Sequence, residues 1–213
     1  MIEGDEEKVK GLAESEVEFL MQMFSEDSKN YHVWSYRQYL VRKLGLWGGE
    51  EIKSVEGLLR RDVRNNSAWS HRFFVVFSNP EYSTPDSKAT ERDPKIPENI
   101  IDREIEFGKA ATFEAPQNQS PWNYIRGVLK KGGRKLSSIE CFAGEFVKIP
   151  DEGEEDVKSS HALDFLADCW AEMGESKKAD KALVLLAEKY DPIRKNYWEW
   201  RQQLLKERKG VIE

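Results

Sequence analysis

A tryptophan motif recurs along the chain at intervals typical of helical repeats. Its copies occupy residues 30–37, 65–72, 119–126 and 195–201. Trp34 and Trp69 are 35 residues apart, the length of one helix–turn–helix unit in an α-solenoid. The spacings of 53 residues from Trp69 to Trp122 and 76 from Trp122 to Trp198 leave room for an insertion and for a degenerate copy. The pattern predicts an all-α fold, a superhelix (solenoid) of antiparallel helical hairpins.

Each unit is expected to contain two helices. The first follows an Asn or Ser that can cap it, and the second carries apolar residues on one face. In the second helix of the first unit, this face is formed by Ile52, Val55, Leu58 and Leu59. Helices are predicted over residues 12–24, 31–41, 50–61, 67–77, 97–111, 121–131, 137–149, 159–173, 177–190 and 194–206. No segment of the sequence predicts a strand.

Residues 79–96 interrupt the repeat with a segment rich in Pro, Ser, Thr and charged residues. Because this composition favours loops, we expect a mobile insertion there. The chain is otherwise predicted to form one repeat domain over residues 1–213. The acidic run at 151–156 lacks the ligand spacing of a calcium-binding loop, so a solvated loop is expected.

Composition narrows the possible functions. Charged residues make up 34% of the chain, but seven Trp, seven Tyr and ten Phe supply enough aromatic surface for a folded core. The net charge of −6, with acidic and basic residues interspersed, argues against a general nucleic-acid binder. The two cysteines, Cys141 and Cys169, form no CxxC pair or Cys/His cluster. We therefore expect a cytoplasmic protein that binds no metal itself and has no membrane span.

Two kinds of candidate residue come from the motif. Trp and Arg at the same place in successive units most often pack between helices. The residues assigned to this repeat scaffold are Trp34, Arg37, Trp69, Arg72, Trp122 and Trp198. The polar start of the first motif helix differs, because free N–H groups at a helix N-terminus favour anions. The residues at this start are Lys29, Asn30, Tyr31 and His32.

The remaining histidines are poor candidates for chemistry. His71 lies within a predicted helix and is expected to be a packed or solvated polar residue, and His161 begins the degenerate repeat. Neither has a neighbouring Ser, Cys or carboxylate arranged for nucleophilic catalysis. No catalytic residue is predicted in this chain.

The motif Asn-Tyr-x-x-Trp-x-x-Arg, which runs from Asn30 to Arg37, resembles the repeat of protein prenyltransferase alpha subunits. Two longer stretches, residues 27–38 and 62–75, are similar to the alpha subunit shared by protein farnesyltransferase and protein geranylgeranyltransferase type I. Further support comes from Leu46-Trp47, Trp122-Asn123-Tyr124 and residues 194–198. The resemblance covers residues 14–205, nearly the whole chain.

The resemblance implies a function within a heterodimer. In this family an alpha-subunit crescent wraps a beta subunit, which holds the catalytic zinc and most of the isoprenoid pocket. The heterodimer transfers a farnesyl or geranylgeranyl group from its diphosphate to the Cys of a C-terminal CaaX motif, with zinc and magnesium as its metals. By this resemblance residues 29–32 line the substrate cleft, and Arg64, Asn65 and Asn66 contact the beta subunit.

The sequence departs from the family pattern at its start. The repeat that bears the family's diphosphate-contacting Lys lies upstream of the first repeat found here, so Lys29 is not given that role. We therefore expect a C-terminal portion of an alpha subunit, and three sources of it stay open: an expressed fragment, a partial gene model or a truncated paralogue. Such a portion is expected to be inactive without a beta subunit.

Two other functions stay open. One is the alpha subunit of the Rab geranylgeranyltransferase, although Arg37-Gln38 and residues 62–67 favour the CaaX enzymes. The other is a helical-repeat scaffold of the tetratricopeptide kind, which binds peptides on its concave face. Tetratricopeptide units depend on Gly and Ala where their helices cross, whereas these units place bulky residues around the Trp.

Overall fold

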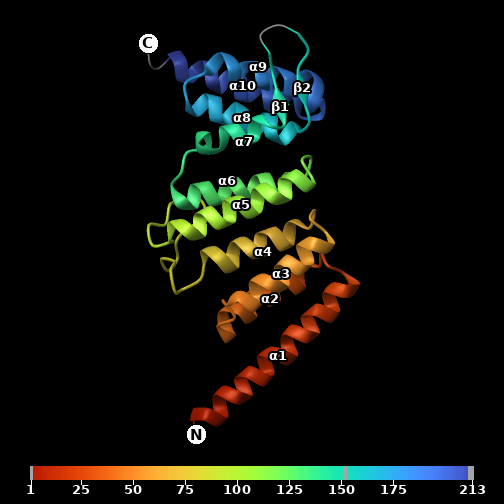
Figure 1. Ribbon diagram of the computed structural model, residues 1–213, viewed down its shortest axis with the longest axis vertical. Coiled ribbons are helices and arrows are strands. Elements are labelled where there is room, and N and C mark those ends of the chain that lie inside the picture. Colours follow the sequence, from red (N-terminus) through yellow and green to blue (C-terminus); the bar gives the residue numbers. More distant parts are fainter. Residues whose placement is uncertain (1, 151–152, 211–213) are drawn as a thin grey trace. The chain divides into compact units, whose positions relative to one another are not determined.

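The computed structural model describes residues 2–150 and 153–210. It divides into two compact units (Figure 1). Unit 1 comprises Met1–Ala89 and Asp93–Pro97, and unit 2 comprises Thr90–Arg92 and Glu98–Glu213. A single domain over 1–213 stays a prediction beside this division.

Unit 1 is built from four helices, α1 (Ile2–Glu26), α2 (Tyr31–Leu44), α3 (Gly49–Arg61) and α4 (Asn66–Phe77). The α2 helix ends at Gly45, whose φ of 69° is the left-handed conformation that glycine adopts at little cost. The chain then returns through α3, and α4 packs against both α2 and α3. One part of the core joins Val41, Phe74 and Val75 to the side chain of Trp47.

The segment between α4 and α5 forms a hydrogen-bonded loop. Asn79 accepts hydrogen bonds from Ser83 through its carbonyl oxygen, at 2.9 Å from the backbone nitrogen and 2.6 Å from the hydroxyl. Further along, the Asp93 carboxylate accepts two hydrogen bonds of 2.8 Å, from the backbone nitrogen and the hydroxyl of Thr84. The mobility of residues 79–96 stays a prediction, and these contacts argue for a preferred loop conformation.

Unit 2 contains the remaining hairpins. Its helices are α5 (Glu98–Glu114), α6 (Gln119–Gly132), α7 (Glu140–Gly144), α8 (Ser160–Glu172), α9 (Ser176–Leu185) and α10 (Lys195–Gly210). Short helical turns lie at η1 (Leu136–Ile139), η2 (Leu186–Tyr190) and η3 (Pro192–Arg194). Trp122 of α6 is 1% exposed, and its ring lies 5.6–5.7 Å from those of Phe142, Phe146 and Phe165. The Trp of the repeat is therefore the centre of an aromatic core in this unit.

The predicted helix over residues 137–149 is wrong. The segment forms the turn η1, the short helix α7 and then strand β1 (Val147–Lys148), which pairs antiparallel with β2 (Asp156–Val157). The prediction that no segment forms a strand is therefore also wrong. Ile139, Phe142 and Phe146 are buried at spacings that also suit one helix, and pairing across the 151–156 segment leaves no local signal. The acidic residues 151 and 152 lie outside the described residues.

The other predicted helices are confirmed to within a few residues, and with them the all-α class built from helical hairpins. The region predicted as 177–190 is divided, since α9 ends at Leu185 and a π-helical turn follows. No helix in the described part of the chain has both the length and the apolar character needed to cross a membrane.

Candidate functional site

The polar residues before and at the start of α2 form the candidate site. Asn30 caps the helix, because its side-chain oxygen accepts hydrogen bonds from the backbone nitrogens of His32 and Val33 at 3.0 and 3.4 Å. Tyr31 is 76% exposed, and its ring lies edge-on to the His32 ring at 5.8 Å. Lys29 forms an exposed ion pair with Asp62, Nζ to Oδ2 3.0 Å. The end of α2 thus presents a phenol, an imidazole and an ammonium group beside free helix N–H groups.

The loop before α2 is held by one backbone carbonyl. The Ser28 oxygen accepts a hydrogen bond of 2.9 Å from the Trp34 indole and one of 2.8 Å from the Asn65 side-chain amide. Asn65 also caps α4 by accepting from the backbone nitrogens of Ser67 and Ala68. With both ends of its amide in use and 1% of its surface exposed, Asn65 orients the loop that carries Lys29.

This contact has a counterpart in unit 2. The Pro116 oxygen accepts a hydrogen bond of 3.0 Å from the Trp122 indole and one of 2.6 Å from the Ser159 hydroxyl. Ser159 in turn caps α8, as Asn65 caps α4. We call this arrangement the shared-carbonyl contact: one carbonyl accepts from the Trp of its own repeat and from the capping residue of the next.

The other residues expected at the beta-subunit surface differ from Asn65 in exposure. Arg64 and Asn66 are both exposed, on either side of the buried amide. The remaining scaffold residues lie in the core: Trp69, Arg72 and Trp198 are at most 2% exposed. Where the sequence expected three adjacent contact residues, the structure leaves two exposed residues around a buried one.

A buried charged group lies beneath α2. Arg37 donates two hydrogen bonds to the Glu51 carboxylate, from Nε at 2.7 Å and from Nη2 at 3.0 Å, and a third from Nη2 to the Ser54 hydroxyl at 2.7 Å. His71 Nε2 lies 2.6 Å from Glu51 Oε1. The three ionisable side chains are at most 5% exposed. They join α2, α3 and α4 through one carboxylate.

The protonation states of this group follow from its contacts. Burial alone would raise the pKa of Glu51, but the hydrogen bonds from His71 and Arg37 outweigh burial and lower its pKa to about 2. Burial lowers the pKa of His71, and its hydrogen bond to Glu51 opposes this in part. We infer a neutral His71 that donates from Nε2 to a charged Glu51. Within the described residues, His71 Nδ1 and Arg37 Nη1 have no hydrogen-bond partner.

The sequence placed Arg37 on aromatic faces and did not predict this ion pair. The stacking is present, since the guanidinium lies 5.6 Å from the Phe24 ring and 5.7 Å from the Trp34 ring. The missed signal is the position of Glu51, four residues before Val55 on the apolar stripe of α3. A carboxylate on a buried stripe requires a cation nearby.

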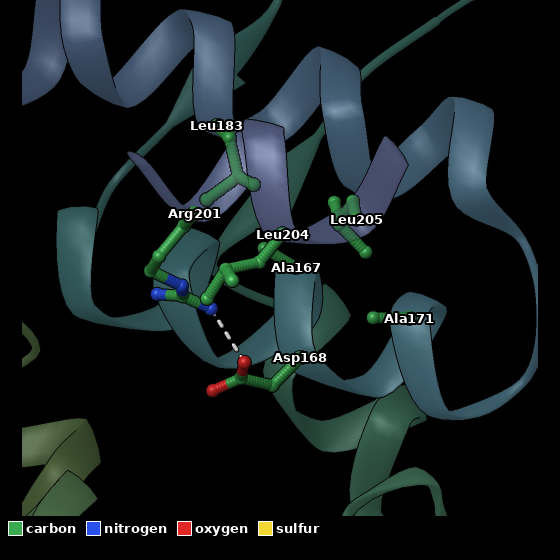
Figure 2. A pocket seen from close by; sticks show the side chains of 7 residues that line it. All are labelled: Ala167, Asp168, Ala171, Leu183, Arg201, Leu204 and Leu205. Carbon is green, nitrogen blue, oxygen red and sulfur yellow. Dashed lines mark hydrogen bonds and ion pairs between the residues drawn. The ribbon is translucent and has the colours of Figure 1, made fainter. Parts of the chain in front are cut away.

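A second charged cluster lies in unit 2. Arg126 of α6 and Arg201 of α10 each pair with both Asp164 and Asp168 of α8. The four side chains are 14–35% exposed, far more than those around Glu51. Figure 2 shows Arg201 directed at Asp168 beside a hollow of about 100 Å³ with leucine and alanine walls.

The described residues do not fit a metal centre, because they contain no group of three or more His, Cys, Asp or Glu side chains that could hold an ion. The two cysteines lie apart in character: Cys141 is exposed and Cys169 is buried. Burial raises the pKa of the Cys169 thiol to about 12, so it is a packed apolar residue at neutral pH.

Comparison with known proteins identifies the family. The model of the protein prenyltransferase alpha subunit repeat matches residues 13–44 and 49–79. The farnesyltransferase/geranylgeranyltransferase type-1 subunit alpha of Candida albicans is 36% identical, in an alignment that covers 87% of this chain and 69% of that protein. The chain belongs to the protein prenyltransferase alpha subunit family. The same subunit of Dictyostelium discoideum is 34% identical over 97% of this chain and 60% of its own length.

The structural match agrees with this alpha-subunit family. A chain of Candida albicans protein geranylgeranyltransferase-I, in a complex with GGPP, matches with a TM-score of 0.78 and 35% identity over 90% of this chain and 58% of that one. The present chain thus spans about three fifths of the Dictyostelium subunit and of this solved chain. The mouse geranylgeranyl transferase type-2 subunit alpha is 31% identical over 54% of this chain and 19% of its own length, so the type-1 relatives match over more of the sequence.

Proposed function

We propose that this chain acts as the alpha subunit, or a part of one, in a heterodimeric farnesyltransferase or type-1 geranylgeranyltransferase. The heterodimer transfers a prenyl group from its diphosphate to the Cys of a C-terminal CaaX motif. The observation that carries the proposal is the 36% identity to the Candida albicans type-1 subunit over 69% of its length. The beta subunit supplies the zinc that activates the Cys thiol, and the described residues of this chain offer no group of their own for that ion.

The start of α2 is proposed to line the cleft at its diphosphate end. Tyr31 and His32 are exposed, and both can donate a hydrogen bond to a phosphate oxygen. Lys29 is 61% exposed in its pair with Asp62, and a surface pair of this kind is weak enough to exchange its partner for a diphosphate. Asn30 has its side-chain oxygen committed to the helix cap, so it positions Tyr31 and His32.

Rim residues of the next repeat are proposed to contact the beta subunit. Arg64 and Asn66 are exposed at the start of α4, where they can meet a partner surface. Asn65, which is buried, supports this surface through the Ser28 carbonyl and the α4 cap. The proposed interface therefore consists of exposed side chains around a rigid, capped turn.

The test is co-expression with a beta subunit of a farnesyltransferase or type-1 geranylgeranyltransferase. We expect a complex on size exclusion and no turnover of a fluorescent CaaX peptide by this chain alone. In the complex, Tyr31→Ala with His32→Ala is expected to weaken prenyl diphosphate binding about tenfold, since two donors are lost. Tyr39→Ala, also exposed on α2, is the matched control. Robust transfer by the pure chain, or no complex with either beta subunit, would contradict the proposal.

A further inference from the structure

Three large apolar side chains share one exposed stripe at the end of unit 2. Ile193 is 96% exposed, Tyr197 is 45% exposed and Trp200 is 54% exposed. Their spacing of four and then three residues places them on one face of the turn η3 and the helix α10. Single exposed apolar residues are common, whereas an aligned group of this size marks a contact surface.

The stripe borders a hollow of about 430 Å³. Its walls include Gln119 and Asn123 of α6, Arg126 of the same helix, Asp164 of α8, and Trp200 and Leu204 of α10. The hollow is large enough for one or two apolar side chains. Gln119 and Asn123 are exposed amides that can bind backbone groups of whatever enters.

The charges around this hollow are already balanced. Arg126 and Arg201 share Asp164 and Asp168, as described above, and Arg194 pairs with Asp191. An anionic ligand such as a phosphate would have to displace two carboxylates from their arginines. The complement of this surface is therefore an uncharged apolar side chain, with hydrogen-bonding groups at its edge.

The aromatic residues of the stripe are held in place before any partner binds. Trp198, fully buried, anchors the helix and lies 4.8 Å from the Tyr197 ring, which in turn lies 5.9 Å from the Trp200 ring. The Arg201 guanidinium lies 5.8 Å from the Tyr197 ring. Because their neighbours restrict these rings, binding costs little side-chain entropy. Trp, Tyr and Arg are also the residues that dominate interface energies.

We propose that the Ile193–Tyr197–Trp200 stripe and the adjoining hollow form a docking site for an apolar projection of the beta subunit. The inference rests on the proposed function, which supplies that partner, and it adds an interface in unit 2 to the one at α4. A second copy of this chain fits less well, since each copy carries a net charge of −6 and like charges repel.

The experiment measures the affinity of this chain for the beta subunit of Candida albicans protein geranylgeranyltransferase-I. The variants are Trp200→Gln and Ile193→Gln, and the matched control is Tyr39→Gln, because Tyr39 and Trp200 are both 54% exposed. We expect at least about a tenfold rise in Kd for Trp200→Gln and about threefold for Ile193→Gln. Tyr39→Gln is expected to stay within about twofold. Circular dichroism and thermal unfolding check that all three variants remain folded.

The possible outcomes separate the two proposals. If the wild-type chain binds and the stripe variants bind equally well, the docking site is overturned and the proposed function stands. If the wild-type chain does not bind at micromolar concentration, the proposed function fails, and this inference with it. If sedimentation shows that the chain alone dimerises and that Trp200→Gln makes it monomeric, the occupant is a second copy and the proposal is overturned.

Discussion

The Arg of the repeat has different surroundings in the two units. In unit 1, Arg37 and Glu51 are at most 5% exposed and share their carboxylate with His71. In unit 2, the arginines of the third and last copies, Arg126 and Arg201, meet two half-exposed aspartates. The same sequence signal therefore gives a desolvated ion pair in one unit and a solvated network in the other. Burial, which the motif does not specify, determines how much each pair contributes to stability.

The largest effect is expected from Glu51→Gln. The substitution keeps the shape of the side chain but leaves the Arg37 charge buried without a counter-ion, which costs about 3–5 kcal/mol. Urea unfolding followed by circular dichroism would measure the loss. A change below about 1 kcal/mol would show that water reaches the pair, and the contrast between the units would then disappear.

The buried histidine should make unit 1 sensitive to mild acid. Since folding lowers the pKa of His71, the unfolded chain binds a proton more tightly, and the free energy of unfolding falls as pH drops below the ordinary histidine value of about 6.5. One proton sets a limit of about 1.4 kcal/mol per pH unit. Glu51 adds a second loss at lower pH, between its ordinary value of about 4.5 and its folded pKa of about 2.

Unfolding measured at pH 7, 6 and 5 tests this assignment. The slope with pH over this range should be reduced in His71→Gln, whose amide can still donate to Glu51. Because unit 2 has no fully buried histidine among its described residues, Asp168→Asn should keep the wild-type slope. An unchanged slope in His71→Gln would assign the acid sensitivity to another group.

The shared-carbonyl contacts compare the units at a second place. Asn65→Ala removes a helix cap and the hydrogen bond to Ser28, and Ser159→Ala removes the equivalent cap and the bond to Pro116. We expect each to cost about 1–2 kcal/mol in thermal or urea unfolding. A cost for one and none for the other would show that the two contacts are alike in geometry only.

The smallest effect is expected from Asp168→Asn. Its carboxylate is 35% exposed, and Asp164 still faces both arginines, so the loss should be under about 1 kcal/mol. Adding 1 M salt should shrink this loss further, because exposed charges are screened at that ionic strength. The cost of Glu51→Gln should change little in the same buffer. Equal salt responses would contradict the difference in burial.

Local signals predicted most of the fold. The capping residues Asn30, Asn65 and Ser159 and the periodic apolar faces indicated where helices begin and which side they bury. The error at residues 137–149 arose because the burial pattern of Phe142 and Phe146 suits a helix, whereas the β1–β2 pairing joins residues ten positions apart. Such a pairing depends on tertiary packing rather than on neighbouring residues.

The candidate site was only partly predictable for the same reason. The polar start of α2 is a local feature, and its exposed Tyr31 and His32 follow from it. The burial of Asn65 depends on the Ser28 carbonyl, 37 residues earlier. The Glu51 partner of Arg37 comes from another helix, and its only local trace was a carboxylate on an apolar stripe.

The shared-carbonyl contact also bears on where the chain tolerates changes in length. The carbonyl stands six residues before the Trp at Ser28, Val63 and Pro116 alike, so one added or deleted residue in such a span would detach the indole. The long loop at 79–96 lies outside all three spans. Insertions are therefore expected to be accepted between repeats and refused within these turns, and a scan of single-residue insertions would map the boundary.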